Sequence, residues 1–221
     1  IDANARTPTH ISEVRLVAQV KATNYTGSFE SSDAVLMQSW YSGAYGSRLN
    51  MMPHSFNSIL MDRGDRVSIQ GDGHPTMAAA LVAFAGSETL ELVHEMLAKT
   101  DSGCAVPKNC PVVDSALLPY PLYWCSSVND WFLASGDRHA FETFAPDMAR
   151  IVDNAVVQFM APDLQIKWFG WDDRVGNGFG STLNLEAQLS FAALTIRACG
   201  DFAQTLALAG DALNATRYTA T

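Results

Sequence analysis

The sequence predicts a mainly helical fold of stacked helical hairpins, either an α-solenoid or an α/α toroid. Segments whose apolar residues recur three and four positions apart cover much of the chain. Two joints between such segments have the same form, Ser135-Gly136-Asp137 and Ala209-Gly210-Asp211. In each joint Gly supplies a left-handed C-cap, and Asp caps the start of the following helix. The repeated joint therefore indicates helices stacked as hairpins.

The predicted elements begin with β-structure, because residues 10–30 alternate loosely and are rich in Val, Thr and Tyr. We expect one or two strands there, with a turn at Thr26-Gly27. The polar run Ser31-Ser32-Asp33 then forms an N-cap cluster, and helical spacing begins directly after it. Further helices are predicted over 76–85, 88–99, 122–135, 140–160 and 184–209. Strands without partners at the front and an unfinished helix at the end predict a part of a larger protein.

The composition excludes two broad classes of function. The chain of 221 residues has a net charge of −9 and no basic stripe, which argues against nucleic-acid binding. No apolar run reaches the roughly 18–20 residues that a membrane helix needs. An acidic surface of this kind suits a protein that handles neutral or cationic ligands.

Cysteines and glycosylation sequons favour a secreted protein. Cys104 and Cys110 bracket the loop CAVPKNC, where a disulfide is sterically easy in an oxidising compartment. N-x-T sequons occur at Asn24 and Asn214. The chain starts at Ile1 without a signal-peptide pattern, so we expect a processed or partial chain.

No metal or other cofactor is expected from the remaining motifs. Cys125 and Cys199 lie in apolar helical patterns and are predicted to be buried thiols, with a disulfide between them as the alternative. Neither a CxxC motif nor a Cys/His metal spacing occurs. The glycines of 176–180 lack the strand–turn–helix context of a dinucleotide fingerprint.

One short stretch is unusually rich in charge. Residues 60–75, LMDRGDRVSIQGDGHP, contain three acids, two arginines and a histidine, although only 17% of the whole chain is charged. One interpretation is an ordinary helix entry, in which Asp and Arg pair at the surface and Pro75 starts a helix. The other is a loop that lines a functional pocket.

Several runs together resemble the six-hairpin glycosidases, most closely the α-L-rhamnosidases of glycoside hydrolase family 78. These runs are GSFESSDAVLMQSWYSGAYGSRLNM, DRGDRVSIQGD, YWCSSVNDWFLASGD and GWDDRVGNGF. The resemblance implies a mainly α fold, a partial (α/α)6 toroid preceded by the last strands of a β-sandwich. Residues 1–32 would be the end of the β-sandwich domain and its linker. Residues 33–221 would be the N-terminal part of an incomplete (α/α)6 barrel catalytic domain.

The same resemblance implies hydrolysis of a terminal sugar from a glycan or glycoside with inversion. Asp65 falls where the family keeps its general acid, and Asp72 is the supporting carboxylate. Such an acid must hold its proton, which requires burial or a neighbouring like charge. The general base would be a Glu in a later hairpin that this chain does not reach, so the rest of the same protein is an expected partner. The expected substrate-binding residues are Asp62, Arg66, His74, Trp171, Asp172 and Asp173.

The run KWFGWDDRVGNGFGS could form a second wall of a sugar pocket. Sugar pockets place aromatic faces against C–H surfaces and carboxylates against hydroxyls, and this run supplies both. The alternative is a loop with core tryptophans. Trp124 and Trp131, seven residues apart on one helical face, are predicted to be core. His54 and His74 would be ordinary loop histidines if they do not bind sugar.

Two departures from the family pattern keep a second function open. Ile69 stands where the family usually has a Trp that walls the sugar pocket. Ile59 and Leu60 stand where the family keeps a carboxylate before the acid. These departures favour a non-catalytic extracellular glycoprotein that binds glycan or plays a structural role, while Asp65 and Asp72 favour the enzyme. A six-hairpin enzyme acting on another sugar is a third reading.

Overall fold

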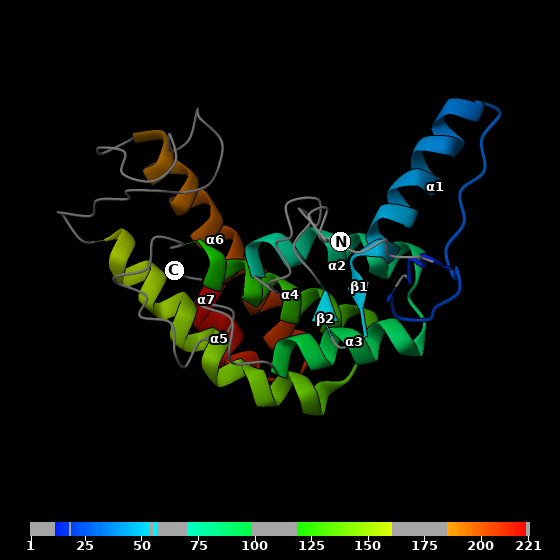
Figure 1. Cartoon of the computed structure of the whole chain (residues 1–221). Coiled ribbons are helices and arrows are strands. Elements are labelled where there is room, and N and C mark those ends of the chain that lie inside the picture. Colours follow the sequence, from blue (N-terminus) through cyan, green and yellow to red (C-terminus); the bar gives the residue numbers. More distant parts are fainter. Residues whose placement is uncertain are drawn as a thin grey trace, which may run out of the picture.

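The computed structural model describes residues 12–17, 19–53, 55–56, 70–98, 119–160 and 185–219 (Figure 1). This part of the chain is mainly helical, as the sequence predicts. Its helices are α1 (Ala34–Leu49), α2 (Gln70–Ala83), α3 (Ser87–Ala98), α4 (Tyr120–Ser135), α5 (Arg138–Phe159), α6 (Leu185–Leu208) and α7 (Ala212–Thr219). Two short strands, β1 (Met51–Met52) and β2 (Ser55–Phe56), pair antiparallel. Within the described ranges, no helix is long and apolar enough to cross a membrane.

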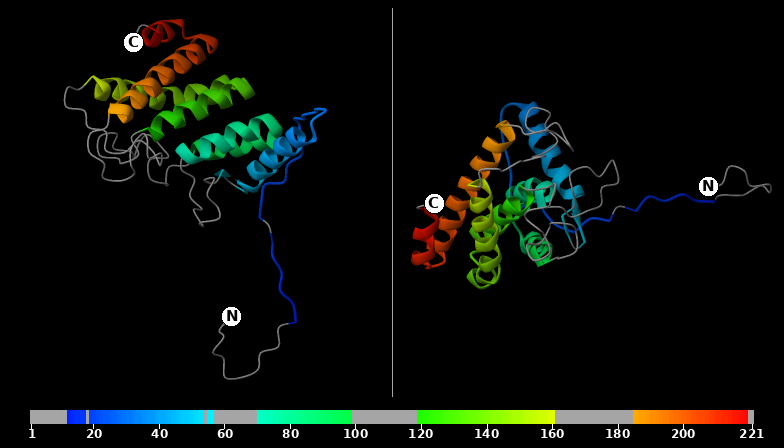
Figure 2. Two further views of the ribbon diagram at one scale, coloured as in Figure 1. Left: turned by 90° about the horizontal axis from the view of Figure 1, so that it is seen from above. Right: turned by 90° about the vertical axis from the view of Figure 1, so that its left-hand side faces the viewer.

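The strands expected over 10–30 do not form in the described residues of that segment. Residues 12–17 instead run as an extended segment away from the helices (Figure 2). Further along, Lys21 N donates to Met51 O over 2.7 Å, and the amides of Thr26 and Gly27 both donate to Ala83 O. The Val and Thr content of residues 10–30 favours extended backbone, but a strand also needs the edge of another strand to pair with. The amides named above instead bond to two isolated carbonyls, one directly after α1 and one at the end of α2.

The cap predicted before the first long helix is confirmed. Asp33 precedes α1, and its Oδ1 accepts hydrogen bonds from Val35 N at 2.8 Å and Leu36 N at 3.3 Å. Ser31 Oγ in turn accepts from Asp33 N. These bonds satisfy amides that have no partner inside the helix, which fixes the start of α1.

Both glycine joints adopt the predicted geometry. Gly136 has φ = 67° and Gly210 has φ = 89°, which places both in the left-handed region. Asp137 Oδ1 accepts from Ala140 N at 3.0 Å, and Asp211 Oδ1 accepts from Asn214 N at 3.2 Å. The joints are short, so α4 and α5 form one antiparallel hairpin and α6 and α7 form another.

The helical hairpins pack side by side in chain order. α4 contacts α2 on one side and α6 on the other, and it also contacts α3 and α5. The helices α2, α4 and α6 begin on the same side of the molecule, and the tight joints lie at the opposite ends (Figure 2). Consequently, the three chain segments that lead into these helices all join the array at one end.

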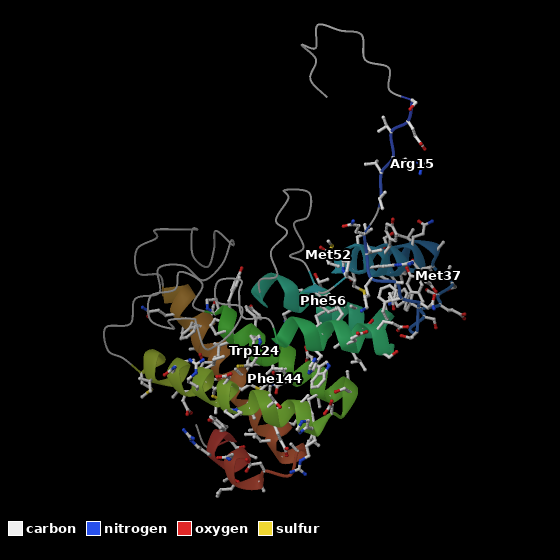
Figure 3. All side chains as sticks on the ribbon, turned by 60° about the horizontal axis from the view of Figure 1, so that its bottom comes forward. Arg15, Met37, Met52, Phe56, Trp124 and Phe144 are labelled. Carbon is white, nitrogen blue, oxygen red and sulfur yellow. The ribbon has the colours of Figure 1, made fainter. Side chains whose placement is uncertain are left out.

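Aromatic rings form a continuous core through the hairpins. Phe132 contacts Phe141, Phe141 contacts Phe202, and Phe202 contacts Tyr218, with ring centroids 4.9 to 6.3 Å apart. Trp124 packs edge-on against Phe144 at 5.8 Å (Figure 3). Trp124 and Trp131 are both buried, which confirms their prediction as core residues. The Trp and Phe side chains of α4 thus hold the outer helix α5 against the row of α2, α4 and α6.

Candidate functional site

Most residues of the predicted site lie outside the described part of the chain. This holds for the predicted acid Asp65 and for the other members of the two candidate loops, Asp62, Arg66, Trp171, Asp172 and Asp173. It also holds for Cys104 and Cys110 and for His54. The structure nevertheless places the points where these segments join the helices. Residue 70 begins α2 within the charged stretch of 60–75, and residue 185 begins α6 shortly after the second candidate run.

Asp72 belongs to the first turn of α2. The predicted helix began at residue 76, so the structure extends it towards the charged stretch by six residues. Pro75 lies inside α2 and not at its start, because the helix begins five residues earlier. The helix-entry interpretation is therefore wrong for Pro75, and the Asp and Arg residues that it pairs at the surface lie outside the described part of the chain.

His74 is the predicted site residue whose side chain the structure describes, and it is not a loop histidine. It lies on α2, and its Nε2 is 2.9 Å from Asp130 Oδ2 on α4. The two side chains are 13% and 37% exposed. The ring of Tyr123 lies 5.9 Å from the imidazole, tilted by 32°. Imidazole, carboxylate and phenol thus meet at the seam between α2 and α4.

Asp130 and Tyr123 were not selected by the sequence analysis. They are seven residues apart on α4, and two helical turns bring them to the same face. A carboxylate in the otherwise uncharged run YWCSSVNDWF was the available signal, but only the packing of α2 on α4 identifies its partner. An Asp that accepts a hydrogen bond from Nε2–H fixes the orientation of a histidine ring and leaves Nδ1 for another group.

The buried cysteines are separate thiols, as predicted, and the disulfide alternative is wrong. Burial raises the pKa of the Cys125 thiol, and burial together with Asp153 raises the pKa of Cys199. A thiol held in its protonated form is a poor nucleophile and a poor metal ligand. Among the described residues no group of three or more His, Cys, Asp or Glu side chains could hold a metal ion.

A groove of about 760 Å³ lies between α5, α6 and α7. Its lining is largely apolar and includes Met160 and Ile196, both of which are exposed. Tyr218 forms part of the wall, and burial, followed by the nearby Asp153, raises its pKa to about 12. The groove has no carboxylate in its lining, so it suits an apolar occupant better than a sugar.

The two sequons lie in different surroundings. Asn24 is exposed in the segment before α1, outside any helix or strand. Asn214 is exposed on α7, and its Nδ2 donates to Asp211 Oδ2 over 2.6 Å.

The helical array is similar to part of two solved glycosidase structures. The GH78 family rhamnosidase of Bacillus sp. GL1 matches 91% of this chain and 21% of its own length, with a TM-score of 0.69 and 17% sequence identity. The α-L-rhamnosidase from Dictyoglumus thermophilum matches 90% of this chain and 22% of its own length, with a TM-score of 0.61 and 15% identity. No protein-family model and no curated protein matches the sequence.

The fold of this chain is therefore that of a part of the GH78 α-L-rhamnosidases. The chain spans about a fifth of the length of these two proteins. This finding confirms, at the level of the fold, the resemblance seen in the sequence motifs.

Proposed function

We propose that this chain forms the first hairpins of an (α/α)6 barrel in a secreted, inverting glycoside hydrolase of the α-L-rhamnosidase type. The observation that carries the proposal is the likeness of the fold to a GH78 rhamnosidase over 91% of the chain. In this proposal residues 1–32 link a β-sandwich domain to the barrel, and residues 33–221 begin the barrel. Secretion is supported by the two sequons and by the Cys104–Cys110 loop.

Unpartnered apolar faces at both ends of the array support a larger barrel. At one end lies the groove of α5, α6 and α7, with Ile196 exposed. At the other end, Val35, Tyr45 and Leu49 are exposed on α1. Apolar faces at the ends of a hairpin array need covering by further helices. The proposed partner is the remainder of the same protein, which would supply those hairpins.

The chemistry assigns different roles to two carboxylates. Asp65 would protonate the leaving glycosidic oxygen, and Asp72 would keep that acid protonated or bind a sugar hydroxyl. On the family resemblance, the base that activates water would be a Glu on a later hairpin. Inverting enzymes place the two carboxyl groups roughly 6.5–9.5 Å apart across the sugar. Asp62, Arg66, His74 and the Trp171-Asp172-Asp173 run would bind the substrate. Because α2 and α6 begin at the same end of the array (Figure 2), the two candidate segments that lead into them would both lie at one barrel mouth.

The test is hydrolysis of an aryl α-L-rhamnoside by the whole protein. We expect Asp65→Asn to lower kcat/KM by about 10²–10⁴, the typical contribution of a general acid. The matched control is Glu142→Gln, since Glu142 is exposed on α5 and pairs with Arg138 one helical turn away. Retained hydrolysis in Asp65→Asn would refute the assignment of the acid.

A second candidate is a non-catalytic extracellular glycoprotein that binds glycan with the same fold. Ile69 and Leu60 favour it, because each replaces a residue type that the family uses in its site. Rhamnoside binding without hydrolysis would support this candidate. Calorimetric titration of the wild-type protein alongside the hydrolysis assay separates the two.

A further inference from the structure

The two sequons present their acceptor groups in opposite ways. In extended backbone, residues i and i+2 point to the same side, whereas in an α-helix they point about 200° apart. Asn24 and Thr26 lie before α1 in a segment without helix or strand. Asn214 and Thr216 lie in α7. A transferase that must contact both the amide and the hydroxyl therefore cannot engage the second sequon while α7 is folded, whereas no helix imposes this separation on the first sequon.

Hydrogen bonding strengthens this contrast. Asn214 Nδ2 donates to Asp211 Oδ2 at 2.6 Å, and Thr216 Oγ1 donates to Ala212 O at 2.9 Å. Both groups of the second sequon thus help to build α7. Asn24 is exposed and makes no side-chain hydrogen bond to another described residue. Its segment is held in place through the backbone, where Thr26 N donates to Ala83 O at 3.0 Å.

The surface next to Asn24 also suits a sugar. Tyr25 and Tyr41 are 42% and 41% exposed, and their ring centroids are 5.8 Å apart. Beneath them, Tyr25 packs on the buried Phe84 and Tyr41 packs on Trp40. The C–H face of an N-acetylglucosamine can cover such rings. By contrast, Asn214 lines a second groove of about 500 Å³ at the joint ends of α5, α6 and α7, next to Arg138 and Gly210.

We propose that Asn24 is an N-glycosylation site and that Asn214 stays unmodified. In the reaction, Asn24 Nδ2 forms a bond to the anomeric carbon of N-acetylglucosamine and loses a proton. The bond from that carbon to the pyrophosphate of the lipid-linked oligosaccharide donor breaks, and the pyrophosphate leaves. The inference rests on the secretion part of the proposed function and not on hydrolysis.

The test is to pass the protein through the secretory pathway of a yeast host and to map glycopeptides by mass spectrometry. We expect one glycan on the wild-type protein, carried by the peptide that contains Asn24. Asn24→Gln and Thr26→Ala should abolish it, because they remove the amide and the hydroxyl respectively. Thr26→Ser keeps the hydroxyl and should retain the glycan, as should the matched control Asn214→Gln.

A glycan on Asn214, or an unmodified Asn24 in wild-type protein recovered from the medium, would overturn the proposal. The wild-type map alone decides this, so a variant that fails to fold does not affect the outcome. Failure here is distinguishable from failure of the hydrolase proposal. The glycan map reports on Asn24, and the Asp65→Asn assay reports on catalysis.

Discussion

His74 Nε2 on α2 lies 2.9 Å from Asp130 Oδ2 on α4 and connects the helix that begins within the charged stretch to its neighbour. The imidazole is largely enclosed, and the carboxylate is more than a third exposed. Removing one partner from an enclosed pair costs more than breaking a surface pair, because the remaining group loses its hydrogen bond without regaining full hydration.

We therefore expect Asp130→Ala to lower the free energy of unfolding by about 1–2 kcal/mol. A double-mutant cycle with His74→Ala should give a coupling energy of about 1 kcal/mol, measured by urea denaturation. The control is Asp201→Ala, which removes an exposed pair with Arg197 on α6 and should change stability by less than about 0.5 kcal/mol. A coupling energy near zero would show that the contact between His74 and Asp130 does not stabilise the fold.

The glycine joints allow a matched comparison. Gly136 has φ = 67° and no atom within 4 Å of an added Cβ, so a substitution there tests the backbone alone. Gly136→Ala should destabilise by about 1 kcal/mol, since an L-residue disfavours this region. Gly200 lies within α6 with equally open surroundings and a negative φ. Gly200→Ala should therefore stabilise by about 0.5–1 kcal/mol. Equal signs for the two substitutions in thermal melts would contradict the assigned backbone geometry.

The ring chain through the hairpins predicts a large cavity effect. Phe141 is 1% exposed and contacts both Phe132 and Phe202. Phe141→Ala should lower the free energy of unfolding by about 3–5 kcal/mol, and Phe141→Leu by about 1 kcal/mol. Leu133→Ala, at an exposed position of α4, is the control and should stay within about 0.5 kcal/mol. A small loss for Phe141→Ala in chemical denaturation would mean that the hairpins do not share one core.

Tyr218 predicts a loss of stability at high pH. Its pKa is raised from 10.0 to about 12, first by burial and then by Asp153. Between these values the unfolded chain has released the proton and the native chain has not. The stabilising effect is therefore complete below pH 10 and is lost as the pH rises towards 12.

The measurement is the urea midpoint at pH 8, 10 and 11 for the wild type and Tyr218→Phe. The variant should lose less stability over this range. The buried thiols Cys125 and Cys199 act in the same direction in both proteins, so the difference isolates Tyr218. Tyr25→Phe, at an exposed ring, should follow the wild type. Identical slopes for Tyr218→Phe and the wild type would contradict the raised pKa.

Local signals allowed much of the helical architecture to be predicted. The N-cap at Asp33 and the Gly-Asp joints act through their own backbone neighbours, so residue type alone indicates them. Buried Trp124 and Trp131 followed from helical spacing. The strand prediction over 10–30 failed because β-propensity describes a preference for extended backbone and says nothing about an available partner edge.

Part of the candidate site could likewise be predicted from local sequence, and part could not. The charged stretch of 60–75 and the family motifs direct attention to Asp65 and Asp72 from sequence alone. Asp130 was missed because its significance depends on His74, 56 residues away in the chain. The sequence around a single helical carboxylate does not indicate which distant side chain it will bond to.

The helices, their caps and the hairpin joints could be predicted from residue types alone, because they depend on residues within about one helical turn of each other. Only the packed structure shows that α2, α4 and α6 lie in a row and that His74 meets Asp130. These relationships join residues that are distant in the chain, and packing between distant segments determines them.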